Sequence, residues 1–398
     1  MDALTTPLPK DWEIKTFRDI STINQGLQIP ISQRLKAPTE HAKFYITIQA
    51  LNNRKEFEYI KTYNESVVCH KDDILMTRTG NTGMVITNIE GVFHNNFFKI
   101  NFDRTLINKD FLVYFLSLEQ TQKTILRKAG TSTIPDLNHN DFYSLSIPLP
   151  PLNEQIAIAN ILSDVDRYLY SLDALILKKE SVKKALSFEL LSQRKRLKGF
   201  NQNWQRVRLG TYKYRRGSFP QPYGNPQWYS DNGMPFVQVY DVGENFKLTQ
   251  KTKQKISKIA QPMSVFVPKN SVIITLQGTI GRVALTQYDC YCDRTILIFD
   301  NNTLNGVNKY FFVLSLFTKF EEEKRKADGS IIKTITKQTL KDFEILLPPL
   351  NEQIAIANIL SALDNEIISL KNKKRQFENI KKALNHDLMS AKIRVLKK

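Results

Sequence analysis

The chain has 398 residues, a formal net charge of +18 and an apolar fraction of 41 %. This length predicts two or three domains, and the apolar content excludes a disordered protein. No stretch approaches the ~18 apolar residues of a membrane span, and the N-terminal "MDALTTPLPKDWEIK" lacks the features of a secretory signal. Because the chain also has only three cysteines without framework spacing, we expect a cytoplasmic protein.

The positive charge is unevenly distributed. Residues 1–150 carry a net charge of +1, whereas residues 201–345 carry +9. Such an excess predicts a polyanionic partner, and nucleic acid is favoured over a membrane surface because no basic amphipathic anchor is present. A basic protein without an anionic partner remains the alternative on charge alone.

The first 150 residues predict a mixed domain of short strands and one helix. A helix is expected near residues 108–128. Alternating or apolar runs predict strands at 43–50, 72–77, 84–89 and 96–102.

A long helix is expected next, over residues 151–199. No Pro or Gly occurs between Pro151 and Gly199. Apolar residues follow a 3-4 spacing that is typical of a coiled-coil seam. They are Leu162, Val165, Leu169, Leu172, Ile176, Leu186 and Leu190.

The second half of the chain repeats the first. The stretch "LPPLNEQIAIANILS" occupies residues 149–163 and recurs letter for letter at 347–361. Strands are expected at 234–242, 271–277, 282–287 and 294–299, with a helix near 307–326. The last helix, over 349–398, has a seam in the same register, formed by Leu360, Leu363, Ile367, Leu370, Phe377, Leu384 and Leu388.

The sequence predicts that each long helix has about 45 residues and is roughly 65 Å long. Neither apolar seam can stay exposed, so we expect the two helices to pack against each other. The alternative is that each seam packs on its own domain. Chain order makes the pair antiparallel, with the C-terminus finishing near the first domain.

These elements predict an α+β protein with a pseudo-two-fold internal repeat: two tandem α/β domains separated by two long antiparallel coiled-coil helices. The expected boundaries are 1–150 and 200–348 for the domains and 151–199 and 349–398 for the helices. Because the helices are nearly identical and the domains diverge, we expect shared docking roles for the helices and different specificities for the domains.

The sequence lacks the usual catalytic motifs. The loop "RTGNTG" at 78–83 resembles a phosphate-binding turn, but the strand-like "MVITNI" comes directly after it, which favours a hairpin. No nucleotide-binding P-loop, methyltransferase motif, histidine pair with metal spacing or nuclease carboxylate cluster is present. Cys290 and Cys292 are separated by one residue without a nearby His, so a metal site is not favoured. Binding is therefore favoured over catalysis.

The arrangement resembles the specificity subunit of a type I restriction–modification system. In that family two target-recognition domains alternate with two helical spacers, and each recognition domain ends at a motif similar to "IPLPPLNEQ" and "ILLPPLNEQ". The resemblance covers the whole chain. It implies recognition of a bipartite, asymmetric site in double-stranded DNA, with one half recognised by each domain.

The resemblance also implies the partners. The helices would dock two modification (methyltransferase) subunits, and restriction subunits would join the full complex. This chain would be non-catalytic and hold no cofactor, since S-adenosylmethionine, ATP and magnesium would belong to the partner subunits. Two rivals are a fused methyltransferase or nuclease, for which the chain leaves no room, and a purely structural coiled-coil protein, which the basic second domain disfavours.

The candidate DNA-binding residues are polar and basic side chains at loop positions shared by the two copies. Arg and Gln suit contacts to base edges, and Lys and Thr suit phosphates. Any one of them could instead be a solvated surface residue. The candidates are Gln28, Arg34, Lys36, Asn53, Arg54, Arg78, Thr79 and Asn81 in the first domain, and Arg215, Arg216, Ser218, Gln221, Lys251, Gln277, Thr279 and Arg282 in the second.

Overall fold

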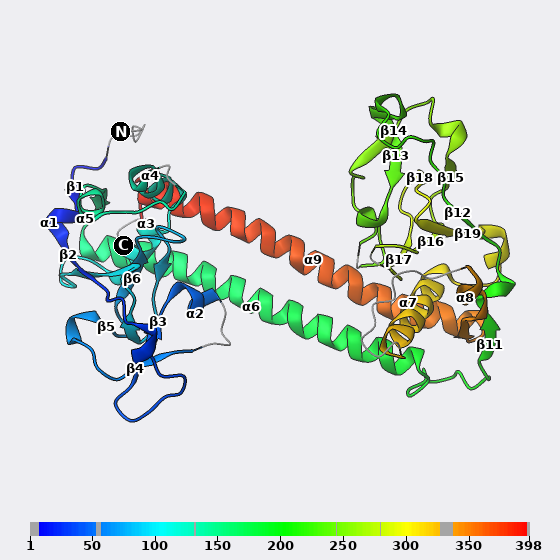
Figure 1. The fold of residues 1–398 in the computed structure, drawn as a ribbon, viewed down its shortest axis with the longest axis horizontal. Coiled ribbons are helices and arrows are strands. Elements are labelled where there is room, and N and C mark those ends of the chain that lie inside the picture. Colours follow the sequence, from blue (N-terminus) through cyan, green and yellow to red (C-terminus); the bar gives the residue numbers. More distant parts are fainter. Residues whose placement is uncertain are drawn as a thin grey trace. The chain divides into compact units, whose positions relative to one another are not determined.

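The computed structural model describes residues 8–52, 57–130, 133–243, 245–278, 280–326 and 337–395 (Figure 1). The chain forms two compact units. Residues 1–174 and 372–398 form the first unit, and residues 175–371 form the second. Each long helix therefore contributes to both units. None of the helices in the described residues is both long and apolar enough to cross a membrane.

The first unit is a mixed α/β structure built on three small sheets. Its strands are β1 (Glu13–Thr16), β2 (Ser21–Gln25), β3 (Lys43–Ile46), β4 (Tyr59–Ile60), β5 (Val68–Cys69), β6 (Ile74–Thr77), β7 (Val85–Ile86), β8 (Gly91–Phe93), β9 (Phe97–Phe102) and β10 (Ser146–Leu149). Its helices are α1 (Phe17–Ile20), α2 (Ile48–Asn52), α3 (Lys109–Leu116), α4 (Glu119–Ala129), α5 (His139–Tyr143) and the first part of α6 (Leu152–Leu191). The strand orders are β2-β9-β6-β7, β4-β3-β8-β5 and β1-β10.

The second unit repeats this topology. Its strands are β11 (Gln205–Arg208), β12 (Tyr214–Arg216), β13 (Tyr229–Val237), β14 (Gln254–Ile256), β15 (Val265–Val267), β16 (Val272–Thr275), β17 (Val283–Leu285), β18 (Cys290–Cys292), β19 (Ile296–Phe299) and β20 (Glu344–Leu347). The helices are α7 (Lys309–Lys326), α8 (Lys337–Asp342) and the first part of α9 (Leu350–Met389). The orders β12-β19-β16-β17, β14-β13-β18-β15 and β11-β20 match those of the first unit strand for strand. The predicted duplication is thus a duplication of structure.

In each unit one strand pair is parallel, while its neighbours are antiparallel. Tyr45 and Ile46 of β3 pair with Val92 and Phe93 of β8. In the second unit β13 pairs with β18 in the same way. Parallel pairing brings the carboxyl ends of both strands to one sheet edge, and the residues beyond those ends meet there.

Most predicted elements are confirmed, with three corrections. The strand predicted at 43–50 ends at Ile46, and residues from Ile48 onward form α2. The helix predicted near 108–128 is two helices, α3 and α4, because the chain leaves the helix at Leu118, which has an extended backbone (ψ 135°). In the second unit α7 is one continuous helix, and the strand predicted at 234–242 ends at Val237.

The glycine loops are hairpin connections, as predicted. β6 pairs antiparallel with β7, and β16 with β17. Gly83 and Gly281 adopt φ angles of 87° and 77°, a region that glycine tolerates at little cost. Their N–H groups donate to the carbonyls of Thr77 and Thr275 at 2.8 and 3.0 Å, so an equivalent hydrogen bond closes both loops.

The long helices pack antiparallel within each unit (Figure 1). In the first unit Lys381 Nζ lies 2.5 Å from Asp166 Oδ1, and Lys374 Nζ lies 2.7 Å from Asp173 Oδ1. In the second unit Lys179 pairs with Glu366 at 2.8 Å. Residue numbers of the paired positions therefore increase along α6 as they decrease along α9. Of the predicted seam, Leu172 and Ile176 of α6 and Ile367 of α9 are buried along the helices. Leu162, Leu190, Leu360 and Leu388 are buried in the cores of the domains, so the ends of both seams pack on the domains.

Each long helix has 40 residues, about five fewer than predicted, and spans about 60 Å. Both end in the same way. Gln193 and Ala391 adopt φ angles of 61° and 55°. The N–H of Lys195 donates to Glu189 O, and the N–H of Ile393 to Asp387 O, each at 3.1 Å. In the first copy this left-handed turn ends α6 before Gly199, the next Gly or Pro, so a prediction based on the absence of those residues was too long.

The repeated "LNEQ" anchors each long helix to its own unit. Gln155 Oε1 accepts from the Asn108 N–H at 2.9 Å, and Gln353 Oε1 accepts from the Asn308 N–H at 2.9 Å. The preceding glutamates, Glu154 and Glu352, are buried. The start of each helix therefore packs on its own domain, while later turns pack on the other helix.

The C-terminal residues lie on the first unit, as predicted. Arg394 Nε donates to Glu154 Oε1 at 2.7 Å, and its Nη2 lies 2.9 Å from Asp11 Oδ2. Leu388 and Met389 are part of the first unit's core together with Trp12 and Phe17.

Candidate functional site

A cleft of about 580 Å³ opens in the first unit at the carboxyl ends of β3 and β8. Most of its lining residues are polar or charged. The lining residues are Arg34, Lys36, Thr47, Ile48, Gln49, Asn52, Glu58, His94 and Asn96. The cleft could accommodate a polar or anionic group.

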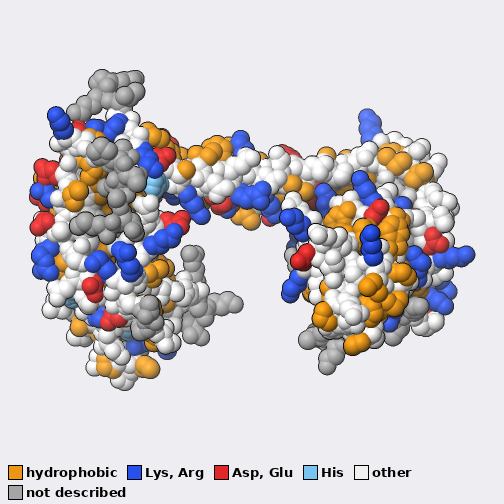
Figure 2. Space-filling view, turned by 90° about the horizontal axis from the view of Figure 1, so that it is seen from above, with side chains coloured by type: hydrophobic (Ala, Val, Ile, Leu, Met, Phe, Trp, Pro, Cys, Tyr) orange, Lys and Arg blue, Asp and Glu red, His pale blue; other side chains and the backbone are white. Residues whose placement is uncertain are grey.

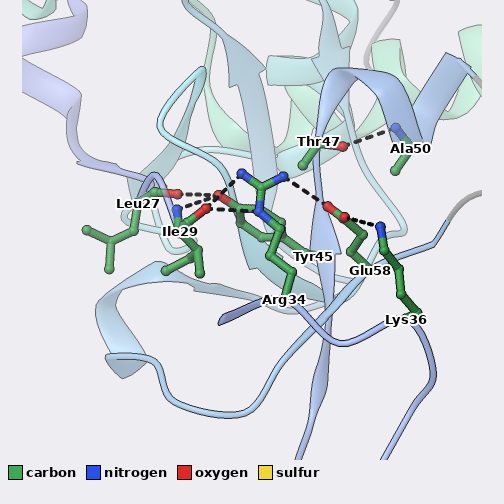
Figure 3. Close-up of polar contacts among 8 residues, drawn as sticks. All are labelled: Leu27, Ile29, Arg34, Lys36, Tyr45, Thr47, Ala50 and Glu58. Atoms are coloured by element: carbon green, nitrogen blue, oxygen red, sulfur yellow. Dashed lines mark hydrogen bonds and ion pairs between the residues drawn. The ribbon is translucent and has the colours of Figure 1, made fainter. Parts of the chain in front are cut away.

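A fixed ion-pair network forms one wall (Figure 3). Arg34 donates from Nε and Nη2 to Ile29 O at 2.9 and 2.7 Å, and from Nη1 to Glu58 Oε2 at 3.0 Å. Lys36 donates to the other Glu58 oxygen at 2.7 Å. Tyr45 supports the same loop, because its hydroxyl donates to Leu27 O at 2.7 Å and accepts from the Ile29 N–H at 3.0 Å.

Two groups in this network, Glu58 and Tyr45, have shifted pKa values. Burial favours the neutral form of the Glu58 carboxyl, but the hydrogen bonds from Lys36 and Arg34 outweigh burial, and the pKa of Glu58 is lowered. Burial raises the pKa of Tyr45. With two cations and one carboxylate, this wall carries a net positive charge, which suits a phosphate or an electronegative base edge.

His94 also lines the cleft, as a neutral ring. Burial and the nearby Arg34 charge lower the pKa of His94. Its Nδ1 accepts from the Asn96 N–H at 3.1 Å, so in the neutral ring the proton is on Nε2. The imidazole is therefore a hydrogen-bond donor at neutral pH.

The other described candidates of the first unit do not line the cleft. Gln28 is exposed, and Asn95 Nδ2 donates to its Oε1 at 3.4 Å. Arg78 is held by Asp136 through two contacts of 2.9 and 2.6 Å. Thr79 forms an isolated bridge with Asp136, Asn81 is exposed at the loop tip, and Asn53 and Arg54 lie outside the described residues.

The second-unit candidates form two groups. Toward β15, Arg215 Nη2 donates to Phe266 O at 3.1 Å and Ser218 Oγ donates to Met263 O at 3.0 Å. Toward the glycine loop, Arg282 Nη1 donates to Val242 O at 3.1 Å. Arg216, Gln221, Lys251 and Gln277 are exposed, and Thr279 lies outside the described residues.

The structure thus brings together Arg34 and Lys36, which both line the cleft, whereas the other described candidates of the first unit are not among its lining residues. It also reveals polar residues that sequence analysis missed, namely Gln49, Asn52, His94 and Asn96. Gln49, His94 and Asn96 share a position just after a parallel strand, whereas Asn52 is the last residue of α2. That signal depends on the pairing of residues about fifty positions apart, which a single sequence does not display.

Basic side chains also lie outside the cleft. Figure 2 shows Lys and Arg side chains on the visible faces of both units and along the helices. In the second unit Lys251 and Lys253 are exposed beside β14. This agrees with the charge excess of the second half and supports a polyanionic partner.

Comparison with known proteins defines the class. The family model described as "Type I restriction modification DNA specificity domain" matches residues 9–179 and 221–379. The chain therefore belongs to the specificity subunits of type I restriction–modification systems, which recognise DNA sequence.

Two relatives from Methanocaldococcus jannaschii match almost end to end. The putative type I restriction enzyme MjaX specificity subunit is 26 % identical, over 98 % of this chain and 95 % of the relative. The type I restriction enzyme MjaVIII specificity subunit is 25 % identical, over 98 % and 94 %. Among solved structures, the type I S subunit from M. genitalium has a TM-score of 0.60 at 17 % identity, covering 96 % of this chain and 98 % of that one, and so shares the fold.

Proposed function

We propose that this chain recognises a bipartite, asymmetric site in double-stranded DNA, with one half-site bound by each unit, and docks two copies of a modification subunit. The observation that supports two half-sites is the duplication: two units have matching strand orders but different surface residues. In this proposal the chain binds and positions, and the chemistry and its cofactors belong to the partner subunits.

The exposed part of the repeated stretch supports two identical docking surfaces. Buried positions such as Glu154, Gln155 and Leu162 are explained by packing. However, Ile156 and Ile354 are 42 % and 38 % exposed although they are identical in the two copies. Exposed asparagines accompany each isoleucine one turn away on the same helix face, at Asn153 and Asn160 in the first copy and at Asn351 and Asn358 in the second. Packing within the chain does not account for them, whereas one partner bound twice does.

The test is the methylated motif in cells that express this chain with its modification subunits. We expect two short specified segments separated by a fixed number of unspecified base pairs. Replacing residues 1–150 with the matching segment of another specificity subunit should alter one segment only. A contiguous motif, or a change in both segments, would refute the proposal.

The number of modification subunits bound per chain tests the proposed docking surfaces. Ile156→Asp and Ile354→Asp should each reduce the complex by one modification subunit, as measured by native mass spectrometry. Ile31→Asp is the matched control, since Ile31 is 74 % exposed and lies outside the repeated stretch. Full occupancy in both helix variants would contradict the assigned surface.

A further inference from the structure

The duplication allows the same backbone position to be compared in two units that recognise different sequences. The segment after β8 is held by the His94 N–H, which donates to Ile46 O at 3.0 Å. The segment after β18 is held in the same way, since the Asp293 N–H donates to Val237 O at 3.0 Å. Both segments therefore begin at equivalent points beside the end of the parallel partner strand.

The far ends of these segments also match. The Arg78 N–H donates to Asn96 O at 2.7 Å, and the Leu276 N–H donates to Thr295 O at 2.8 Å. A glycine lies against each segment, and a Cβ on Gly26 would lie 2.3 Å from Phe93 O, while a Cβ on Gly217 would lie 2.2 Å from Cys292 O. Such close backbone approach leaves the two segments little freedom to differ in conformation.

Apolar residues that flank the segments are buried in both units. Ile46 and Phe97 of the first unit have zero exposure, as do Val237 and Ile296 of the second. The backbone geometry and the flanking apolar positions are thus preserved.

The polar side chains on this scaffold are different. The first unit carries Gln49 after β3 and His94 and Asn96 after β8, all lining the cleft. The second unit carries Tyr240, which is 45 % exposed, at the position of Gln49. Asp293, Arg294 and Thr295 stand at the positions of His94, Asn95 and Asn96. Asp293 is buried, whereas Arg294 is exposed and lies 5.3 Å from the Tyr223 ring centre. Residues with a packing role are kept between the copies, as Glu154 and Glu352 show. Changed side chains on an unchanged backbone are what two recognition surfaces for different base pairs require.

We propose that the residues directly after the parallel strand pairs determine specificity: Gln49, His94 and Asn96 for one half-site, and Tyr240 and Arg294 for the other. The inference rests on the proposed DNA recognition and names the side chains that perform it. Amide side chains can donate and accept in pairs at adenine edges, whereas a guanidinium pairs with guanine. Arg34 and Lys36 would then serve the phosphates next to the first set.

The experiment uses the full chain expressed in cells with its modification subunits, and sequencing measures the methylated motif. Gln49→Ala and Asn96→Ala should each relax the discrimination at one position of one half-site by roughly tenfold or more. Arg294→Ala should do the same in the other half-site. Asn379→Ala, an exposed amide on α9, is the control and should leave the motif unchanged.

A second variant distinguishes altered recognition from loss of folding. Gln49→Glu keeps the size of the side chain but removes its donors, so we expect the preferred base to change toward cytosine rather than methylation to vanish. Unaltered recognition of the other half-site shows that each variant is folded.

The two proposals fail differently. If the wild-type chain gives no bipartite motif, the proposed function is wrong. If the wild-type motif is bipartite but Gln49→Ala, Asn96→Ala and Arg294→Ala all leave it unchanged, or change both halves, the assignment of these residues is wrong.

Discussion

Arg196 and Glu352 lie 156 residues apart in the sequence and form a two-point ion pair, with Nε 3.2 Å from Oε1 and Nη2 2.6 Å from Oε2. The Trp204 indole N–H also donates to Oε2, at 3.1 Å. The first unit has the equivalent group, in which Arg394 and Trp12 donate to Glu154. Each glutamate of the repeated motif therefore ties the start of one long helix to the chain just beyond the end of the other.

Glu352→Ala should lower the free energy of unfolding of the second unit by about 2–4 kcal/mol, because it leaves Arg196 and the Trp204 N–H without an acceptor. Urea denaturation followed by tryptophan fluorescence measures this change. Glu366→Ala is the matched control. Its side chain is 45 % exposed and pairs with Lys179, so about 1 kcal/mol or less is expected. Equal losses in the two variants would contradict the role assigned to Glu352.

Arg78→Ala and Arg282→Ala should each weaken DNA binding, by about 1–3 kcal/mol if the arginine contacts a base. Both residues flank the equivalent glycine loops. Titration with duplexes that carry the methylated motif, at two salt concentrations, gives the affinities.

Since Asp136 engages two nitrogens of Arg78, Asp136→Ala is the necessary control. It removes the same ion pair but keeps the arginine. A loss of affinity confined to Arg78→Ala assigns the effect to DNA contact, whereas unchanged affinity in both arginine variants would exclude these residues from the interface.

Acidification should destabilise the first unit through His94. Burial and the Arg34 charge lower the pKa of His94, while in the unfolded chain it has its ordinary value of about 6.5. The unfolded state therefore binds the proton more readily, and the stability contributed by the neutral ring is lost as the pH falls below about 6.5.

Thermal unfolding at pH 7.5, 6.5 and 5.5 measures this dependence. His94→Gln should lose less stability than the wild-type chain over this range. His41→Gln should behave like the wild type, because the His41 side chain is 80 % exposed. The same acid-induced loss in His94→Gln as in the wild type would show that another group is responsible.

Local patterns predicted much of the fold. The seven-residue spacing of Leu162 to Leu190 indicated a seam, and the exact repeat indicated two copies, because both signals lie along the chain. The hairpin at 78–83 was predicted from the strand-like residues directly after it. In these cases neighbouring residues in the sequence determine the structure.

The candidate site was predicted only in part, because it depends on distant pairing. Tyr45 and Val92 become partners only when β3 and β8 align in parallel, and this pairing places Gln49 and Asn96 at one edge. Likewise, nothing near Arg78 in the sequence indicates that Asp136 will bind it. Polarity selected Arg34 and Lys36, which line the cleft, but it could not distinguish a guanidinium held by a carboxylate from one directed at DNA.

The long helices should set the distance between half-sites. α6 contributes to both units and, as a continuous helix, has no flexible joint that could absorb a change in length. DNA rises about 3.4 Å per base pair, so half-sites on one face are expected about one turn, roughly 34 Å, apart or a multiple of it. Four residues inserted after Ser181 would add about 6 Å of helix and rotate the remainder of α6 by about 40°.

The ion pairs between the helices show which insertion in α9 would compensate for the insertion in α6. Lys179 pairs with Glu366 and Lys183 with Asp364, on either side of Ser181. With the insertion in α6 alone, Lys179 and Lys183 can no longer both align with their partners on α9. The pairing of the helices should therefore break, and methylation should fall at all sites. A second insertion of four residues after Asn365 keeps both pairs, and the doubly lengthened chain should methylate a motif whose spacer is one or two base pairs longer, with the same specified bases. Sequencing the methylated sites of both variants decides between the two outcomes: an active double insertion with an unchanged spacer would show that the helices join the units without setting the spacing of their half-sites.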